Sequence, residues 1–402
     1  MVEEIKKDFP ILSQSINGHP LCYLDSAASA QKPQAVIDAV NDIMLHYYSN
    51  VHRGAHTLAS KSTIAYEGAR AKVAKFINAK SENEIVFTRS ATASINLVAS
   101  SFGESLKEGD EIILSELEHH ANIVPWYFLQ EKKGIKLKII PISDNGDLDL
   151  QEFEKLLSPK TKLVAISQMS NVLGGLTPIK EIVQKAHQAG AKVLIDGSQG
   201  VVHHGVDVQD VDCDFYVFTG HKLYALTGIG VLYGKEDLLN SMPPYQGGGD
   251  MIERVSFEKI TYKNAPNRFE AGTPPIIEAV SLSAAIDYLS KFNRQELIAH
   301  EKELLNAMED GLEKLGEIKM FNKASNRCGI LSFNIEGVHH QDAATVMDKM
   351  GVAVRSGLLC AEPLMHRLKV QGTVRASLAM YNDMNDIERF VESVYKAKKM
   401  LS

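Results

Sequence analysis

The sequence predicts an α/β protein, with a mostly parallel seven-stranded sheet in a large domain and a smaller α+β domain at the C-terminal end. Three observations lead to this prediction. The chain has 402 residues, enough for two or three domains of roughly 100–200 residues each. Short apolar runs alternate with amphipathic stretches over most of its length, as in alternating strands and helices. From Cys328 onward the pattern changes to short strands mixed with helices.

The large domain is expected to contain seven strands with helices between them. The strands are predicted at Glu84–Thr88, Glu111–Leu114, Lys136–Pro141, Lys162–Ser167, Lys192–Asp196, Asp214–Thr219 and Gly228–Tyr233. Helices are predicted at Ala91–Ser101, Val124–Lys133, Leu150–Leu157 and Ile179–Ala189. Two longer helical patterns, Ala279–Phe292 and Glu296–Leu315, are expected to leave this domain. Ligands bind beyond the carboxyl ends of strands in such sheets, so residues just after strands are the functional candidates.

The smaller domain is predicted from five further segments. Strands are expected at Cys328–Ile335, Val352–Arg355 and Val374–Ala379, and helices at Gln341–Met350 and Asn385–Leu401. The last segment has apolar residues at helical spacing. We expect the large domain to span residues 15–290 and the small domain to combine residues 1–14 with 291–402.

Composition and charge favour a soluble, cytoplasmic protein. Hydrophobic residues make up 45% and charged residues 23% of the chain, which excludes a disordered or fibrous protein. The net charge of −7 argues against nucleic acid as the main partner. Four cysteines without CxxC spacing indicate neither a zinc site nor a disulfide framework, and a reducing compartment is expected. The N-terminus is unlike a signal peptide, and no apolar run approaches the roughly 18 residues of a membrane helix.

Lys222 and Asp196 each follow a strand of the predicted sheet. Most lysines are solvated surface charges, but Lys222 lies between a bulky apolar strand and a Gly-rich turn, where burial would lower its pKa. Asp196 ends an apolar strand, where a turn or helix cap is an equally good interpretation. One strand–loop–strand passage separates the two residues and places both at one sheet edge. A carboxylate for a pyridinium nitrogen and a lysine for an aldehyde are what pyridoxal phosphate chemistry requires.

Two further groups follow strands. Ser90-Ala91-Thr92 opens a helix, where hydroxyls and free N–H groups can bind a phosphate, although a plain N-cap fits the same residues. His119 and His120 follow the second predicted strand. Such a pair is more often a polar surface than a site, but a flat imidazole can stack on a cofactor ring.

Several separate sequence blocks together identify a family resemblance. They are Tyr-Leu-Asp-Ser-Ala-Ala-Ser-Ala-Gln-Lys-Pro (23–33), Val-His-Arg-Gly (51–54), Glu-His-His-Ala-Asn-Ile-Val-Pro-Trp (118–126), Ser-Asn-Val-Leu-Gly (170–174), Arg-Phe-Glu-Ala-Gly-Thr-Pro (268–274) and Arg-Ala-Ser-Leu-Ala-Met-Tyr-Asn (375–382). With these blocks the chain resembles, over nearly its whole length, the group II (SufS-type) cysteine desulfurases. These belong to the class V aminotransferase superfamily of fold-type I pyridoxal phosphate enzymes.

The resemblance implies a role for each matching residue. Lys222 would be bonded to the cofactor aldehyde, Asp196 would hold the pyridinium nitrogen, and Gln199 the phenolic oxygen. His119 would stack on the ring and assist proton transfers. The phosphate would be held by Ala91, Thr92, Thr219, His221 and, from the partner subunit, Thr273. The substrate would be faced by Asn171, Arg355, Arg375 and His52, with Arg375 gripping its carboxylate as a bidentate arginine can.

Cys360 distinguishes the subclass. A lone cysteine is usually an inert core residue, but Cys360 follows a Gly turn and precedes a Pro, so we expect it on a loop. The catalytic cysteine of the resembled family occupies this place. The chain departs from the family pattern at Leu358 and Leu359, where the group often has His-His or Gln-His.

The implied function is that of a homodimeric cysteine desulfurase. It would convert L-cysteine to L-alanine, keep the sulfur as a persulfide on Cys360 and pass it to an acceptor protein, most commonly for iron–sulfur cluster assembly. No metal, nucleic acid or membrane is expected to take part. The alternatives are a selenocysteine lyase or another class V enzyme and, less favoured because Lys222, Asp196 and Cys360 are all present, a non-enzymatic sulfur-assembly scaffold.

Overall fold

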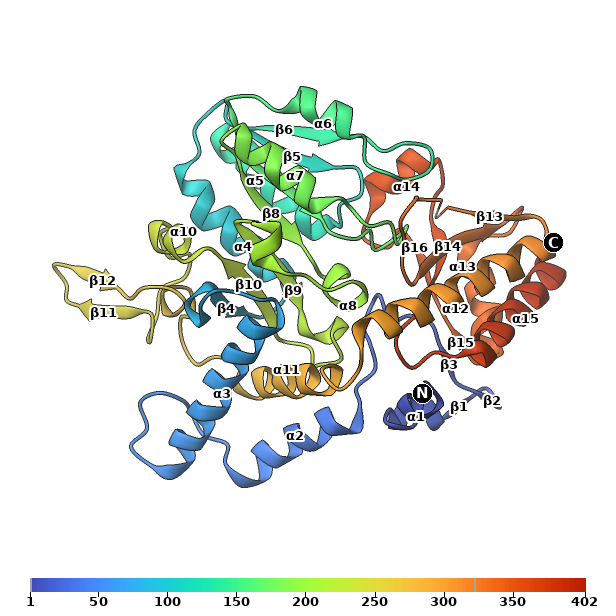
Figure 1. The fold of residues 1–402 in the computed structure, drawn as a ribbon, viewed down its shortest axis with the longest axis horizontal. Coiled ribbons are helices and arrows are strands. Elements are labelled where there is room, and N and C mark those ends of the chain that lie inside the picture. The colour runs from blue at the N-terminus through green and yellow to red at the C-terminus, as the bar shows by residue number, and fades with distance from the viewer. Residues whose placement is uncertain (1, 322) are drawn as a thin grey trace.

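A seven-stranded sheet forms the centre of the molecule. The computed structural model describes residues 2–321 and 323–402. The strands lie in the order β4 (Ile85–Thr88), β10 (Gly230–Gly234), β9 (Phe215–Thr219), β8 (Lys192–Asp196), β7 (Thr161–Ser167), β5 (Glu111–Ser115) and β6 (Lys136–Ile140) (Figure 1). All neighbouring pairs from β9 to β6 are parallel, and β10 runs antiparallel to both of its neighbours. This confirms the predicted α/β fold with a mostly parallel sheet.

Helices cover both faces of this sheet because its strands are apolar on both sides. Alternate residues of a strand point to opposite faces. Phe215 therefore lies in one buried cluster with Trp126 of α5 (Val124–Lys133), and Tyr216 lies in the other with Ile182 of α7 (Ile179–Gln188). The remaining predicted helices are α4 (Ala91–Ser101) and α6 (Leu150–Leu156). All four helices were predicted correctly to within one residue at each end.

Three helices correct the sequence prediction. The segment Ala279–Phe292 was expected to leave the large domain, but α11 (Ile276–Leu289) packs against α2 (Gln34–His46) and α3 (Thr57–Phe76) beside the large sheet (Figure 1). Neither α2 nor α3 was predicted. Both helices carry exposed apolar side chains outside their buried faces, such as Leu45 of α2 and Ile64 of α3. These residues make the buried face harder to recognise from the sequence.

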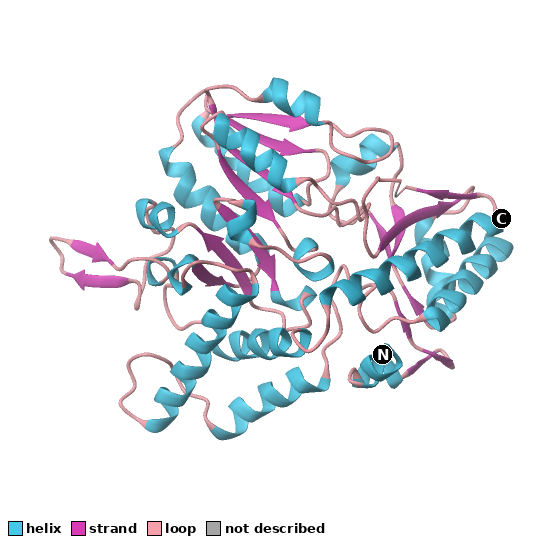
Figure 2. Ribbon diagram, viewed as in Figure 1, coloured by secondary structure: helices cyan, strands magenta, loops and turns pink. Residues whose placement is uncertain are grey.

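A second, four-stranded antiparallel sheet lies towards the C-terminal end (Figure 2). Its order is β13 (Ile318–Met320), β14 (Ile330–Ile335), β17 (Thr373–Ser377) and β16 (Arg355–Gly357). It packs with α12 (Arg294–Leu315), α13 (His340–Lys349) and α15 (Met384–Leu401) around one apolar cluster. The helix α14 (Glu362–Leu368) was not predicted. The domain boundaries assigned from the sequence stay a prediction.

The segment predicted as one strand, Val352–Arg355, is split in the structure. Residues Val352–Ala353 form β15, which pairs in parallel with β3 (Cys22–Tyr23), and Arg355 opens β16 of the small sheet. Just after β3, Asp25 bridges to Ser377 of β17. The chain near residue 25 thereby lies beside the small sheet, although most of the N-terminal part of the sequence belongs beside the large one.

The other elements are short. They are α1 (Val2–Lys7), β1 (Ser15–Ile16), β2 (His19–Pro20), α8 (Gly200–His203), α9 (Val208–Val211), α10 (Glu236–Ser241) and the protruding hairpin of β11 (Ile252–Val255) and β12 (Ile260–Tyr262) (Figure 1). Among the described residues, no helix combines the length and the apolar character that crossing a bilayer requires.

One buried ion pair ties α3 to the sheet. Arg70 is 2% exposed and its two terminal nitrogens lie 2.7 and 2.9 Å from the carboxylate oxygens of Glu270. The same carboxylate accepts hydrogen bonds from the backbone N–H of Phe87 on β4 and from the hydroxyl of Tyr66. A buried charge that keeps all its partners is tolerated, whereas a buried charge that loses one is costly.

Replacing Glu270 by Ala should therefore lower the free energy of unfolding by about 3–5 kcal/mol, since it leaves the Arg70 guanidinium buried without its main partner. Urea titration followed by circular dichroism measures this change. Lys155→Ala, which removes an exposed ion pair with Glu152, is the control and should cost about 0–1 kcal/mol. Equal losses in the two variants would contradict the importance of the buried pair.

Candidate active site

A cavity of about 310 Å³ lies at the carboxyl ends of β7, β8 and β9. Residues of both sheets line it. They include Ala27, Ser90, Ala91, Thr92, His119, Asn171, Asp196, Ser198, Gln199, Thr219, His221, Lys222, Arg355, Leu359, Cys360 and Arg375. Residues that are far apart in the sequence are thus brought together where ligands of α/β sheets bind.

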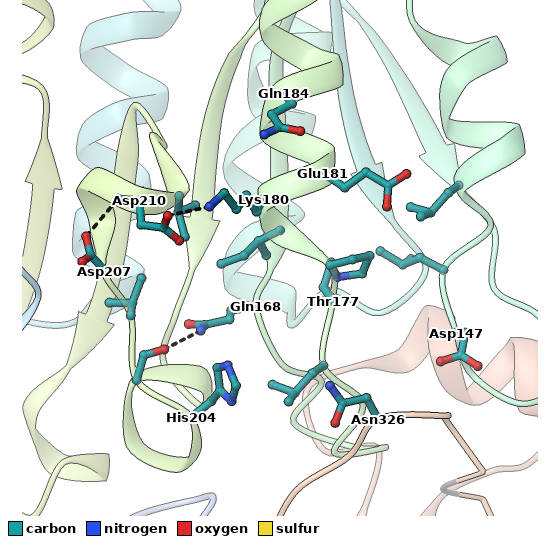
Figure 3. A pocket seen from close by; sticks show the side chains of 18 of the residues that line it. Asp147, Gln168, Thr177, Lys180, Glu181, Gln184, His204, Asp207, Asp210 and Asn326 are labelled. Carbon is teal, nitrogen blue, oxygen red and sulfur yellow. Dashed lines mark hydrogen bonds and ion pairs between the residues drawn. The ribbon is translucent and has the colours of Figure 1, made fainter. Parts of the chain in front are cut away.

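A wider groove of about 1060 Å³ lies elsewhere on the molecule (Figure 3). Its rim carries Lys180, which is paired with Asp210, and Asp207, which caps α9. None of the site residues predicted from the sequence lines this groove. We therefore place the candidate site in the smaller cavity.

Lys222 closes the cavity from the end of β9. It is the last residue of the 3₁₀ turn Gly220–Lys222, which starts where β9 stops. Burial lowers the pKa of Lys222, Asp196 opposes this by raising it, and Arg375 lowers it, so that the pKa is about 8. About a tenth of the amine is then uncharged at pH 7, far more than in an ordinary lysine, and the uncharged amine is the form that reacts with an aldehyde.

Asp196 ends β8, the parallel neighbour of β9. Its Oδ1 accepts hydrogen bonds from the backbone N–H of Ser198 at 3.0 Å and from the Ser198 hydroxyl at 2.6 Å. Both bonds go to the same oxygen, which leaves Oδ2 for a ligand. Gln199 donates one amide hydrogen to the carbonyl of Ala27 at 2.8 Å and keeps the second for another acceptor.

His119 is held by its own turn. Its Nδ1 accepts a hydrogen bond from the N–H of Ala121 at 3.0 Å. Burial and, second to it, the charge of Lys222 lower the pKa of His119 to about 4. The ring is therefore neutral at pH 7, and the hydrogen bond to Nδ1 assigns its proton to Nε2. In this state His119 can donate a proton from Nε2.

Hydroxyls and a helix N-terminus gather at one end of the cavity. Ser90 caps α4 by accepting the N–H of Ala93 at 3.1 Å, and the next two residues, Ala91 and Thr92, line the cavity. A side chain at position 230 of β10 would lie 2.3 Å from the backbone of Ser90, so Gly230 permits this close approach. First-turn N–H groups and hydroxyls form a binding site for an anion such as a phosphate.

Two arginines share one aspartate at the other end. Arg375 is 2% exposed, donates to the carbonyl of Asn171 at 2.9 Å and lies 3.3 Å from Oδ1 of Asp25. Arg355 binds Oδ2 of the same carboxylate at 2.7 Å. The Nε of Arg375 is buried and has no hydrogen-bond partner among the described residues. A carboxylate from a ligand would satisfy this donor.

Cys360 is the exposed cysteine of the chain, and the other three are buried. Burial raises the pKa of Cys22 and Cys213 and raises that of Cys328 to about 12. Buried thiols of this kind are poor nucleophiles because the thiolate is the reactive form. Cys360 lies on the loop between β16 and α14, as the sequence predicts, and lines the cavity.

Two predicted residues do not reach this cavity within their own chain. His52 lies on the connection between α2 and α3, where its Nε2 contacts Glu67 at 2.8 Å, and Thr273 precedes α11. Thr273 was expected to act from a partner subunit. Sequence reasoning missed Ser198 and Asp25. Asp25 lies in block 23–33, one of the blocks that carry the family resemblance, and could have been chosen as a candidate on that ground. The roles assigned to all these residues stay predictions.

The donors around the cavity fit pyridoxal phosphate. A partly neutral lysine suits the aldehyde, a buried carboxylate with one available oxygen suits the pyridinium nitrogen, and the start of α4 suits the phosphate. The unpartnered Nε of Arg375 remains for a substrate carboxylate. Among the described residues, no group of three or more His, Cys, Asp and Glu side chains could hold a metal ion.

Comparison with known proteins places the chain in a family. The family model described as aminotransferase class-V matches residues 22–390. The cysteine desulfurase of Dickeya dadantii (strain 3937) is 48% identical over 402 residues, which cover 100% of this chain and 97% of that protein. The cysteine desulfurase of Enterobacter sp. (strain 638) is also 48% identical over 402 residues, with 100% and 99% covered.

Solved structures agree. The crystal structure of the cysteine desulfurase CsdA (S-sulfonic acid) from Escherichia coli matches with a TM-score of 0.93 at 40% identity, over 100% of this chain and 99% of that one. The apo structure of the cysteine desulfurase from Thermococcus onnurineus NA1 matches with a TM-score of 0.94 at 37% identity, over 99% and 98%. The chain therefore belongs to the class V aminotransferase family and, within it, to the pyridoxal phosphate-dependent cysteine desulfurases.

Proposed function

We propose that the cavity converts L-cysteine to L-alanine and that Cys360 takes the sulfur. The observation that carries this proposal is the meeting of an exposed cysteine with a half-buried lysine and a buried aspartate in one cavity. An aminotransferase needs no cysteine at this place. The exposed thiol therefore favours removal of sulfur over transfer of an amino group.

Different residues of the cavity would bind the cofactor and the substrate. Ala91, Thr92, Thr219 and His221 line the end that would hold the cofactor phosphate. Asp196, fixed by Ser198, would keep the pyridinium nitrogen protonated, and Gln199 would donate its second amide hydrogen to the phenolic oxygen. Arg375 would bind the substrate carboxylate through its unpartnered Nε, beside Asn171 and Arg355. This carboxylate contact orients the substrate sulfur towards Cys360.

We assign the transfer of the substrate Cα proton to Lys222 and a supporting role as donor to His119. Pyridoxal phosphate, when bound, withdraws the electron pair that remains after the Cα proton of the substrate leaves. Lys222 accepts that proton, since its lowered pKa makes the amine a base near neutral pH. His119, neutral with its proton on Nε2, would donate a hydrogen bond from that nitrogen to the bound substrate.

Transfer of the substrate sulfur to Cys360 requires no external oxidant. The thiolate of Cys360 attacks the substrate sulfur, an S–S bond forms, and the Cβ–S bond breaks. The electron pair of the broken bond stays on Cβ, which then takes a proton, so L-alanine leaves and Cys360 keeps a persulfide. Its exposure suits delivery of this sulfur to an acceptor protein, for which iron–sulfur cluster assembly in the cytoplasm is the proposed use.

Cys360→Ser should lower the rate of L-alanine release from L-cysteine, measured with a thiol reductant present, by at least about 100-fold, because the nucleophile is lost. The change in cofactor absorbance on adding L-cysteine should persist, since Lys222 and Arg375 are intact. Cys328→Ser, at a buried cysteine that does not line the cavity, is the matched control and should stay active. Equal alanine release from wild type and Cys360→Ser would remove Cys360 from the reaction.

The rate at which the cofactor-free protein captures pyridoxal phosphate should rise with pH and level off above about pH 8. Only the neutral amine attacks the aldehyde, and the pKa of Lys222 is lowered from 10.5 to about 8. Mixing experiments that follow the yellow absorbance from about pH 6.5 to 9.5 test this, with a free lysine derivative measured in parallel to correct for titration of the cofactor. A rate that still rises about tenfold per pH unit between pH 8.5 and 9.5, as for an ordinary lysine, would contradict the burial argument.

We propose in addition that two chains form a homodimer in which Thr273 of one reaches the phosphate bound by the other. Thr273→Val should then weaken pyridoxal phosphate binding by about tenfold, the cost of one hydrogen bond to a charged group. Equilibrium dialysis measures the affinity, with Thr345→Val on α13 as the control. A mass of one 44.3 kDa chain in solution, together with full affinity in Thr273→Val, would refute the shared site.

A further inference from the structure

The turn that carries His119 also holds the loop of Cys360. The backbone N–H of His120 donates to the carbonyl oxygen of Cys360 at 2.7 Å. The ring Nε2 of the same residue accepts the backbone N–H of Glu362 at 3.0 Å. One residue therefore contacts the cysteine loop at Cys360 itself and two positions beyond it.

The ring of His120 does for α14 what a capping residue ordinarily does. This helix begins at Glu362, and its N-cap residue is Ala361, whose side chain can accept no hydrogen bond. The first N–H groups of a helix have no partner within the helix, and Ser, Thr, Asp or Asn at the N-cap usually satisfies one of them. Here the acceptor comes from a residue more than 200 positions away in the sequence.

The cysteine loop needs such support because its backbone is strained. Leu359 and Cys360 both have left-handed conformations, with φ of 53° and 54°. Such a conformation is unfavourable for a residue other than glycine and persists only where the surroundings hold it. On the N-terminal side, Asn171 donates from its side chain to the carbonyl of Leu359 at 2.8 Å. His120 supplies the tie on the C-terminal side.

We propose that His120 is a positioning residue that holds the thiol of Cys360 in register with the substrate. His119 and His120 are adjacent, and the turn that continues from them to Asn122 is anchored by the side chain of Asn122, which donates to Glu118 at 2.7 Å. The residue that faces the cofactor and the residue that holds the nucleophile's loop thus belong to one turn. The inference rests on the proposed function, since it concerns delivery of Cys360 to the substrate sulfur.

Three variants separate the hydrogen bond from the bulk of the ring. The side-chain oxygen of Gln reaches as many bonds from Cα as Nε2 of histidine, whereas that of Asn is one bond shorter. His120→Gln should therefore keep the tie to Glu362, and His120→Asn and His120→Ala should lose it. We expect kcat for alanine release to fall by about 10- to 100-fold in the Asn and Ala variants, as misplacement by about 1 Å can do, and by no more than about twofold in Gln.

The KM for L-cysteine and the cofactor absorbance should stay unchanged in all three variants, because Arg375 and Lys222 are untouched. The inference is overturned if His120→Ala keeps wild-type kcat, or if His120→Gln falls as low as His120→Asn. It is also overturned if KM rises in step with the loss of kcat, which would indicate a general distortion of the site.

Hydrogen exchange gives a readout that does not depend on turnover. In peptides covering residues 355–368, exchange should be faster in His120→Ala and His120→Asn than in wild type and unchanged in His120→Gln. Unchanged exchange in His120→Ala would show that the ring does not hold the loop. If wild type itself releases no alanine, the proposed function fails, while the exchange comparison still decides whether the tie exists.

Discussion

The rest of the site depends on two parallel strands that end at the same edge of the large sheet, because their ends place a carboxylate beside a lysine. β8 ends in Asp196 and β9 leads directly to Lys222, and their parallel pairing brings both residues to the same cavity. Burial of a lysine ammonium is unfavourable, and the carboxylate of Asp196 offsets part of that cost. The balance leaves the pKa of Lys222 at about 8. A lysine in water would be almost fully protonated at neutral pH and would neither capture an aldehyde nor act as a base.

The rest of the cavity depends on contact between the two sheets. The large sheet supplies the end suited to the cofactor, through α4, β8 and β9. The small sheet supplies Arg355 and Arg375 at the opposite end, both held by Asp25. Asp25 lies outside the strands of both sheets. It follows β3 and forms a single bridge to Ser377 of β17, at the side of the small sheet. One carboxylate thus places two cations beside a cavity that also receives a lysine, and it limits their mutual repulsion.

His119 and His120 also connect the part of the site on the large sheet with the part that follows the small sheet. His119 is fixed by its own turn and faces the cavity, and His120 faces the loop of Cys360. The loop itself follows the small sheet, so its position relative to the large sheet depends on contacts such as these. Leu358 and Leu359 replace residues that could carry protons in the related pattern, and Leu359 is buried while Leu358 is exposed. Lys222 is therefore the group near the cysteine whose pKa, about 8, suits proton transfer at neutral pH.

The sequence by itself determined the strands of the large sheet, the four helices α4, α5, α6 and α7, the lysine and aspartate at the edge of that sheet and the loop position of Cys360. These follow from local patterns, because apolar periodicity and the residue after a strand are both readable within a few positions. Tertiary structure alone decided the packing of α11 on α2 and α3, the split of Val352–Arg355 between two pairings and the sharing of Asp25 by two arginines. It also placed the ring of His120 at the start of α14. Each of these depends on which distant segment supplies a hydrogen-bond partner or covers an apolar face. A contact between residues hundreds of positions apart cannot be predicted from the local sequence pattern around either residue.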